Sequence, residues 1–167
     1  MIALACDHTG VEMKREFQKM LEEMGYSCKD FGNNDTAGGD DYPVFGYRAA
    51  KAVASGECDR GILICGTGVG IGLAANKVKG IRCVTCSEPY SAELSKRHNN
   101  SNMISIGSRV VGIELAKMIV AAWLNAQFEG GRHARRVDKI RSIEDMMAVE
   151  RAEEIAEGVS QMQQEPR

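Results

Sequence analysis

The chain has 167 residues, of which 44% are hydrophobic and 26% are charged, and its formal net charge is −2. This composition is typical of a globular domain with one core, and the balanced charge excludes an electrostatic attraction to nucleic acid. No apolar run is long enough to cross a bilayer, and the N-terminus lacks the basic region of a signal peptide. We therefore expect a cytoplasmic protein without membrane contact, whose six cysteines are free thiols.

The first third of the chain alternates short apolar runs with amphipathic segments. Apolar residues recur at three- and four-residue spacing between Val11 and Met24, which predicts a helix with one buried face. Pro43 stands near the start of the next helical pattern, where its missing N–H is tolerated. In order, we predict a strand over 2–5, a helix over 11–24, a strand over 26–31, a polar Gly-rich loop over 32–41 and a helix over 42–55.

The stretch over 61–77 carries the strongest signal of chemistry. Residues 62–64 are an apolar run typical of a strand buried on both faces, and Cys65 follows at its end. Four glycines then alternate with other residues before a helical segment over 73–77. Such a turn gathers backbone N–H groups and lets an anion come close, aided by the helix dipole. The pattern predicts a thiol beside a cradle for a phosphate or an oxyanion.

The second half repeats the alternation of strands and helices. Ser87 is the expected N-cap of a helix that has Pro89 in its first turn and ends near Arg97. A helix over 110–128 is apolar nearly all round, which favours burial or contact between copies. The other predicted elements are strands over 81–85 and 103–106, a polar break over 98–102, and a last helix from about Arg132, amphipathic as far as Gly158 and frayed over 161–167.

Five strands alternating with helices at short connections define the expected fold class. This order predicts an α/β protein in which one parallel sheet has helices on both faces, joined by right-handed crossovers. In such a sheet the loops that follow the strands share one edge, where ligands bind. Asp7, His8, Cys65 and Arg109 follow predicted strands. His98 instead ends a helix at the opposite edge, so it would reach Cys65 only from a second copy of the chain.

Several interpretations stay open at this level. Cys65 can be a small core residue, and an arginine pair such as Arg132 and Arg136, four residues apart, can be a solvated helix face as well as a phosphate clamp. Three histidines and a cysteine match no compact zinc spacing, so we expect no metal. Ile71 stands where the dinucleotide fingerprint needs glycine, which leaves Glu88 as weak support for a nucleotide site.

A series of motifs in fixed order carries a family resemblance. They are Asp7-His8, Cys65–Gly70, Ala74–Lys77, Cys86–Tyr90, Arg97–Asn99, Gly107–Arg109 and Gly130–His133. Together they span about residues 2–141 and resemble the sugar-phosphate isomerase family that contains ribose-5-phosphate isomerase B and the galactose-6-phosphate isomerase subunits. The resemblance implies a Rossmann-like three-layer α/β/α sandwich with a five-stranded parallel sheet over 1–141, and an extended C-terminal helix or tail over 142–167.

The same resemblance implies a function. It is the interconversion of ribose 5-phosphate and ribulose 5-phosphate in pentose-phosphate metabolism, without cofactor or metal, by a homodimer with active sites between subunits. Pairing of dimers into tetramers is left open. The alternatives are a hexose-phosphate isomerase acting on allose 6-phosphate, and a sugar-phosphate-binding module without catalysis.

Residue roles also come from the resemblance. It makes Cys65 the base that moves a proton between C2 and C1, and His98 the residue that opens the furanose ring. Asp7 lies by the sugar hydroxyls and, with Thr67, joins the catalytic set. The implied substrate-binding residues are Asp7, His8, Tyr42, Asn99, Arg109, Arg132 and Arg136, with the amides of Gly66, Thr67, Gly68, Val69 and Gly70 holding the enediolate oxygen.

These residue types suit the chemistry independently of the resemblance. Aldose isomerisation needs a base, an acid for ring opening, and donors where oxyanion charge develops. One branch of the family has Glu at the position of Ile71. Isoleucine cannot act as a base, so in this chain proton abstraction falls to Cys65. Because Cys65 and His98 occur in one chain, a self-sufficient homodimer is favoured over two unlike subunits.

Overall fold

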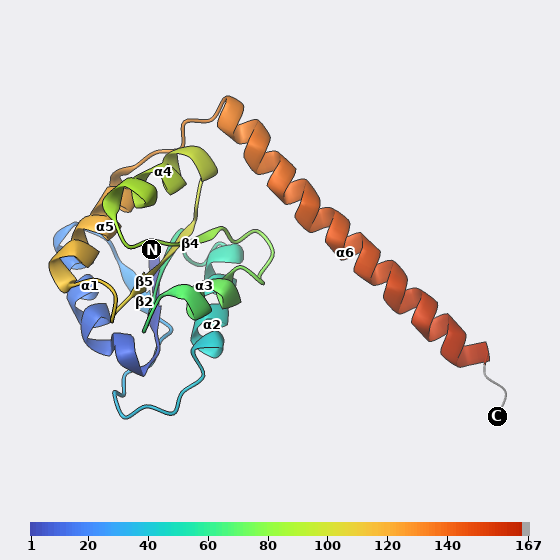
Figure 1. The fold of residues 1–167 in the computed structure, drawn as a ribbon, viewed down its shortest axis with the longest axis horizontal. Helices are drawn as coiled ribbons and strands as arrows, with labels where there is room; N and C mark the ends of the chain where they lie inside the picture. The colour runs from blue at the N-terminus through green and yellow to red at the C-terminus, as the bar shows by residue number, and fades with distance from the viewer. Residues whose placement is uncertain (165–167) are drawn as a thin grey trace. The chain divides into compact units, whose positions relative to one another are not determined.

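The computed structural model describes the backbone of residues 1–164 and the side chains of residues 1–155. Strands and helices alternate along the chain as the sequence predicts (Figure 1). The elements are β1 (Ile2–Cys6), the 3-10 turn η1 (His8–Gly10), α1 (Val11–Glu23), β2 (Cys28–Asp30), α2 (Tyr42–Ala54), β3 (Arg60–Cys65), α3 (Val69–Ala75), β4 (Cys83–Thr85), α4 (Pro89–Asn99), β5 (Met103–Gly107), α5 (Ile113–Asn125) and α6 (Arg132–Gln164).

The five strands form one parallel sheet in the order β2-β1-β3-β5-β4. The central strand β3 pairs with β1 on one side and β5 on the other, so that Ile64 lies opposite Cys6 and Cys65 lies opposite Gly107. The carboxyl ends of these three strands therefore meet at one edge of the sheet. This edge is where open parallel sheets bind their ligands.

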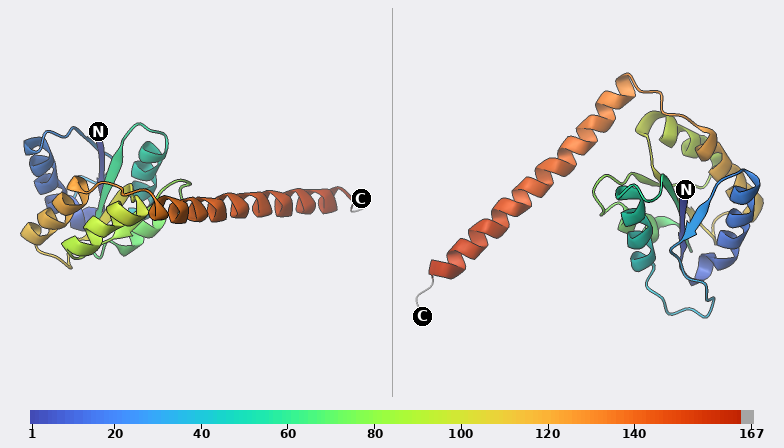
Figure 2. Two further views of the ribbon diagram at one scale, coloured as in Figure 1. Left: turned by 90° about the horizontal axis from the view of Figure 1, so that it is seen from above. Right: turned by 180° about the vertical axis from the view of Figure 1, so that it is seen from behind.

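Alternate residues along each strand face two separate cores. Ile62 and Ile104 pack with apolar residues of α1, α4 and α5, whereas Leu63 and Met103 pack with those of α2 and α3. Helices thus cover both faces of the sheet, and α1 (blue) and α2 (teal) lie on opposite sides of it in Figure 2. The predicted three-layer α/β/α sandwich with a five-stranded parallel sheet is confirmed.

The chain divides into two compact units, one over 1–129 and the other from residue 130 onward. The second unit holds α6, which confirms the expected extended C-terminal helix. Because α6 continues to Gln164, the fraying predicted for 161–164 is wrong, and 165–167 lie outside the described residues. The division predicted between 141 and 142 rests on the family resemblance and stays a prediction.

None of the helices within residues 1–164 combines the length and the apolar character that a membrane span requires.

Strand β2 and helix α5 are shorter in the structure than predicted, because turns occupy positions where the apolar pattern still continues. Strand β2 starts after Tyr26, whose N–H donates to the Leu21 carbonyl at the end of α1. Helix α5 starts at Ile113 and not at residue 110, since the N–H groups of Val110 and Val111 both donate to the Gly107 carbonyl. Apolar character alone does not reveal where such a turn closes.

One further expectation is corrected at the helices, and another is refined. Helix α4 is capped by Glu88 and not by Ser87, since the Glu88 carboxylate accepts the Ser91 N–H at 2.9 Å. Helix α5 is apolar on both sides, but only one side is buried: Trp123 is fully buried, whereas Met118 is 61% exposed. Burial therefore holds for one face of this helix, and contact between copies, the other expectation for it, stays a prediction.

Candidate active site

Cys65 ends the central strand β3, at the carboxyl edge of the sheet. Its side chain belongs to the core between the sheet, α2 and α3, and the residue is 5% exposed. The same residue also lines a cleft of about 290 Å³, together with Asp7, His8, Tyr42 and Arg109. Cys65 therefore borders the cleft as well as the core, and a ligand in the cleft can contact it.

A tight turn over 66–68 joins Cys65 to α3. The helix begins at Val69, earlier than predicted, so it includes residues that were expected to belong to the turn. Gly68 adopts a φ of +77°, and a Cβ at this position would lie 2.9 Å from the Ile106 carbonyl carbon. Glycine satisfies both constraints because it has no Cβ. The Gly68 N–H donates to Cys65 Sγ at 3.1 Å, so the turn orients the sulfur.

The turn also positions two other predicted site residues. The Thr67 hydroxyl accepts the N–H of Val69, the first residue of α3, at 3.3 Å. A Cβ at Gly70 would lie 2.6 Å from the Tyr42 ring, so the missing side chain lets that ring lie against α3. Thr67, Gly70 and Tyr42 line the same cleft as Cys65, as the sequence predicts.

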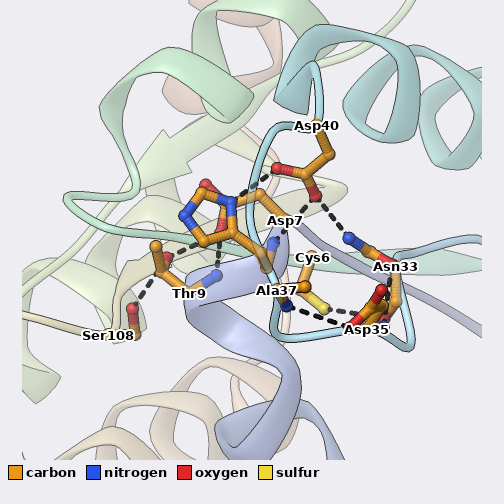
Figure 3. Close-up of polar contacts among 9 residues, drawn as sticks. Cys6, Asp7, Thr9, Asn33, Asp35, Ala37, Asp40 and Ser108 are labelled. Atoms are coloured by element: carbon orange, nitrogen blue, oxygen red, sulfur yellow. Dashed lines mark hydrogen bonds and ion pairs between the residues drawn. The ribbon is translucent and has the colours of Figure 1, made fainter.

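Asp7 follows β1 and organises the neighbouring strand ends (Figure 3). Its Oδ1 accepts the Thr9 N–H at 2.9 Å and the Thr9 hydroxyl at 2.6 Å. The Ser108 hydroxyl, after β5, lies 3.2 Å from both Thr9 Oγ1 and the Cys65 carbonyl oxygen. Hydrogen bonds thus connect the ends of β1, β3 and β5. Sequence reasoning assigned no role to Thr9 or Ser108.

His8 is held by a residue that sequence reasoning missed. Asp40, in the loop between β2 and α2, accepts hydrogen bonds from the His8 ring at 2.6 Å and from the His8 backbone N–H at 2.8 Å. It also accepts one from the Asn33 amide at 2.7 Å (Figure 3). Burial opposes ionisation of the Asp40 carboxyl, but these hydrogen bonds outweigh it and lower the pKa of Asp40.

Lys14 anchors the other end of the same loop. It projects from α1 with a side chain that is 1% exposed. Its Nζ donates to Asp30 Oδ2 at 2.6 Å, to the Asn33 carbonyl at 2.7 Å and to Asn34 Oδ1 at 2.8 Å. A buried ammonium is stable only with such partners. The loop that carries Asp40 is therefore tied to the body of the domain before it reaches His8.

Arg109 is placed at the cleft as predicted. It follows β5, is exposed, and lines the cleft with Cys65 and Gly66. A Cβ at Gly66 would lie 3.6 Å from Arg109 Cδ, so the guanidinium stem passes over the glycine turn. A cation at this position can meet an anionic group held by the turn.

His98 and Asn99 are not at the cleft of their own chain. They end α4, at the edge of the sheet where β3 and β5 begin, as the hydrogen bond from the Gly61 N–H to the Asn102 carbonyl shows. His98 Nε2 lies 3.8 Å from Glu129 Oε2. The expectation that His98 needs a second copy to meet Cys65 is therefore consistent with the fold.

Arg132 and Arg136 lie in the first turns of α6, which belongs to the second unit. Within that unit the Arg132 side chain donates to His133 Nε2 at 3.3 Å. Their expected role at a phosphate stays a prediction.

The fold and the cleft define a class of protein. A Rossmann-like sheet presents a thiol, a glycine turn, an imidazole and a guanidinium at its carboxyl edge, which suits a small anionic ligand. Residues 2–140 match the family described as Ribose/Galactose Isomerase, and the chain belongs to that family.

Individual relatives resemble the chain over most of their length. It is 57% identical over 143 residues to ribose-5-phosphate isomerase B of Escherichia coli (strain K12), a match that covers 86% of this chain and 95% of that protein. A structure of Clostridium thermocellum ribose-5-phosphate isomerase B matches with a TM-score of 0.85 and 51% identity, covering 87% of this chain and 98% of that one. A structure of ribose-5-phosphate isomerase B from Mycoplasma genitalium with bound ribulose-5-phosphate matches with a TM-score of 0.83 and 41% identity. The match covers 86% of this chain and 95% of that one.

Proposed function

We propose that the chain is a ribose-5-phosphate isomerase, which interconverts ribose 5-phosphate and ribulose 5-phosphate. The single observation that carries the proposal is Cys65 at the cleft edge of the sheet, oriented by the Gly68 N–H at 3.1 Å. The relatives named above are enzymes of this activity, and one of them is solved with ribulose-5-phosphate. Identity of 57% to the Escherichia coli enzyme supports the transfer of that activity.

Cys65 is the base in this proposal. As a thiolate it takes the proton from C2 of the open-chain aldose, and the C1 carbonyl oxygen gains negative charge as the enediolate forms. Backbone N–H groups of the turn over 66–70 stabilise that oxygen, other than those of Gly68 and Val69, which already donate within the chain. The Cys65 thiol then returns the proton to C1, and the proton of the C2 hydroxyl passes to O1, which gives the ketose and restores the thiolate. Ile71, buried and apolar, takes no part.

The remaining roles complete a site between two copies of the chain. His8 and Arg109, at the cleft, bind the phosphate or its neighbourhood, and Arg132 and Arg136 add to the clamp. His98 of a second copy opens the furanose ring, and Asn99 binds the sugar beside it. The protein is then a cytoplasmic homodimer in which neither chain holds a complete site.

The test is substitution of the proposed base. Cys65→Ala should reduce turnover of ribose 5-phosphate by roughly 10²–10⁴-fold, the usual scale for a positioned base, while calorimetric titration still detects binding of the sugar phosphate. Cys86→Ala is the matched control, because this thiol is also 5% exposed but does not line the cleft. Near-normal turnover in Cys65→Ala would refute the assignment.

The size of the sugar is tested separately. Kinetics on ribose 5-phosphate and on allose 6-phosphate, measured side by side, distinguish a pentose from a hexose phosphate. Binding of either compound without ketose formation would favour a sugar-phosphate-binding module instead.

A further inference from the structure

The loop over 32–41 makes its hydrogen bonds to His8, a residue of the cleft, through the Asp40 carboxylate. Asp40 has a side chain that is 12% exposed, and both of its oxygens are engaged. Oδ1 lies 2.6 Å from His8 Nδ1. Oδ2 accepts the His8 backbone N–H at 2.8 Å and the Asn33 side-chain amide at 2.7 Å. Asp40 thus holds His8 by its ring and by its backbone at the same time.

These contacts determine where the ring carries its proton. An ionised carboxylate has no hydrogen to donate, so a hydrogen bond between Oδ1 and Nδ1 requires that Nδ1 carries the proton. The lowered pKa of Asp40 keeps the carboxylate ionised at neutral pH. Nε2, across the ring, makes no hydrogen bond with any of the described residues 1–164, and His8 lines the cleft. Nε2 is therefore the nitrogen left for a ligand.

We propose that Asp40 is a positioning residue of the active site: it keeps the proton of His8 on Nδ1 and presents Nε2 to the sugar phosphate. This inference rests on the proposed function, because it deepens the role of a cleft residue. Asp40 touches no substrate itself and acts through His8, as outer hydrogen-bond partners of histidine do in other sites.

The rest of the loop supports a positioning role. The Lys14 ammonium donates hydrogen bonds to the Asn33 carbonyl and to Asn34 Oδ1. Gly32 passes so close to β1 that a Cβ there would lie 2.4 Å from the Cys6 N atom. The loop is thereby fixed before Asn33 donates to Asp40. A loop that is anchored at these points holds the Asp40 carboxylate more rigidly than an unanchored loop would.

Asp40→Asn is the informative variant because two donors converge on the Oδ2 position. The asparagine oxygen will take that position, since the His8 N–H and the Asn33 amide both need an acceptor. Its NH₂ group then faces Nδ1 and requires that Nδ1 accept. The neutral ring must move its proton to Nε2, which is the opposite tautomer.

The tautomer is read directly by two-bond ¹H–¹⁵N correlation spectra of labelled full-length protein over a pH series. The chain has three histidines, and the His8 signals are those missing in His8→Gln. The titratable and charged groups near His8 are Asp40, which contacts its ring, and Asp7, Tyr42, Cys65 and Arg109, which share the cleft with it. We expect an Nδ1 proton in the unaltered chain and an Nε2 proton in Asp40→Asn. An unchanged tautomer overturns the inference.

Kinetics give the second readout. In Asp40→Asn we expect KM for ribose 5-phosphate to rise by roughly tenfold with kcat changed less than about twofold, the pattern of a lost binding contact. Asp41→Asn is the matched control, because this neighbour loses the same charge and makes no side-chain cap to α2. Its KM should stay within about twofold of the unaltered chain.

Two further variants separate positioning from loop anchoring. Asn33→Ala removes the Asn33 side-chain bond to Asp40 but leaves the contact with His8 Nδ1, so it should preserve the tautomer and most of the affinity. In a His8→Gln background, Asp40→Asn should have no further effect on KM, since the residue it acts through is absent. An equal effect in both backgrounds, or the same loss in Asn33→Ala, overturns the inference.

The two proposals fail separately. The tautomer is measured without substrate, so absence of isomerase activity in the unaltered chain would reject the proposed function and leave the spectra as the test of Asp40.

Discussion

At the scale of single residues, environment separates cysteines that are alike in sequence. Burial raises the pKa of Cys6 to about 12, with partial opposition from Lys14, and it raises the pKa of Cys83 to about 12 and of Cys86 to about 11. These three are neutral thiols that fill the core. Cys65 differs because it ends the central strand and lines the cleft.

Gly68 is the residue on which the shape of the cradle depends. Gly68→Ala should lower the free energy of unfolding by at least ~1–2 kcal/mol, because its φ of +77° disfavours any L side chain and its Cβ would meet the Ile106 backbone. Urea denaturation measures this. Gly66→Ala is the control, since a Cβ there meets Arg109 Cδ at an ordinary 3.6 Å. Equal stability of the two variants would contradict the argument.

Asp40 should contribute a pH-dependent part of the stability. Because its pKa is lowered by folding, its contribution is present above the unfolded value of about 3.9 and is lost as the pH falls through the lower folded value. The stability difference between the unaltered chain and Asp40→Asn should therefore shrink as the pH falls below about 4. Urea denaturation at a series of pH values checks this; a difference that does not shrink in acid speaks against it.

At the scale of elements, a loop and a helix are joined by a buried charge. Lys14 lies on the otherwise apolar face of α1, where its side chain is 1% exposed, and it meets the segment that follows β2. An apolar stripe in the sequence gives no sign of this, because a lysine on such a stripe is usually at its border. The fold places three acceptor oxygens around the Lys14 ammonium, and these hydrogen bonds offset the cost of burying its charge.

Removal of the Lys14 ammonium should loosen that loop. Lys14→Met should lower the free energy of unfolding by about 2–3 kcal/mol, because it leaves the Asp30 carboxylate and two further acceptors without their donor. Lys19→Met is the control: Lys19 pairs with Glu16 on the surface, with a side chain that is 67% exposed, and should cost less than about 0.5 kcal/mol. Urea midpoints compare the two, and similar losses would count against a structural role for Lys14.

Helix α6 is the element whose sequence pattern suits a partner. Ile140, Ile143 and Met147 recur on one face and are exposed. Long helices gain most of their stability from packing such a face. This is in keeping with the proposed homodimer.

At the scale of the whole molecule, a site shared by two copies makes a prediction that a site within one chain does not. Cys65→Ala and His98→Asn should each be nearly inactive alone. Mixed by co-expression, they should recover about a quarter of the unaltered activity, because half of the dimers are hybrid and one of the two sites in each hybrid has both residues. Activity assays on the purified mixture test this. Without recovery, Cys65 and His98 would have to act from the same chain.

The alternation of strands and helices was readable from the sequence, because apolar periodicity directly reflects burial. The sequence also identified Cys65 and its glycine turn. That part of the candidate site is formed by residues that are close in sequence and follow a buried strand. The boundaries of β2 and α5 were not readable, because turns such as the one closed by the Gly107 carbonyl depend on backbone hydrogen bonds and not on side-chain polarity.

What the sequence determined by itself was the layered fold and the residues that follow its strands, because both depend on local pattern and on the common direction of parallel strands. Tertiary structure alone decided that Asp40 holds His8 and that Lys14 anchors the loop over 32–41, which carries Asp40. Those contacts join residues 32 and 16–20 positions apart, and only the closure of the loop onto the sheet brings their charges together.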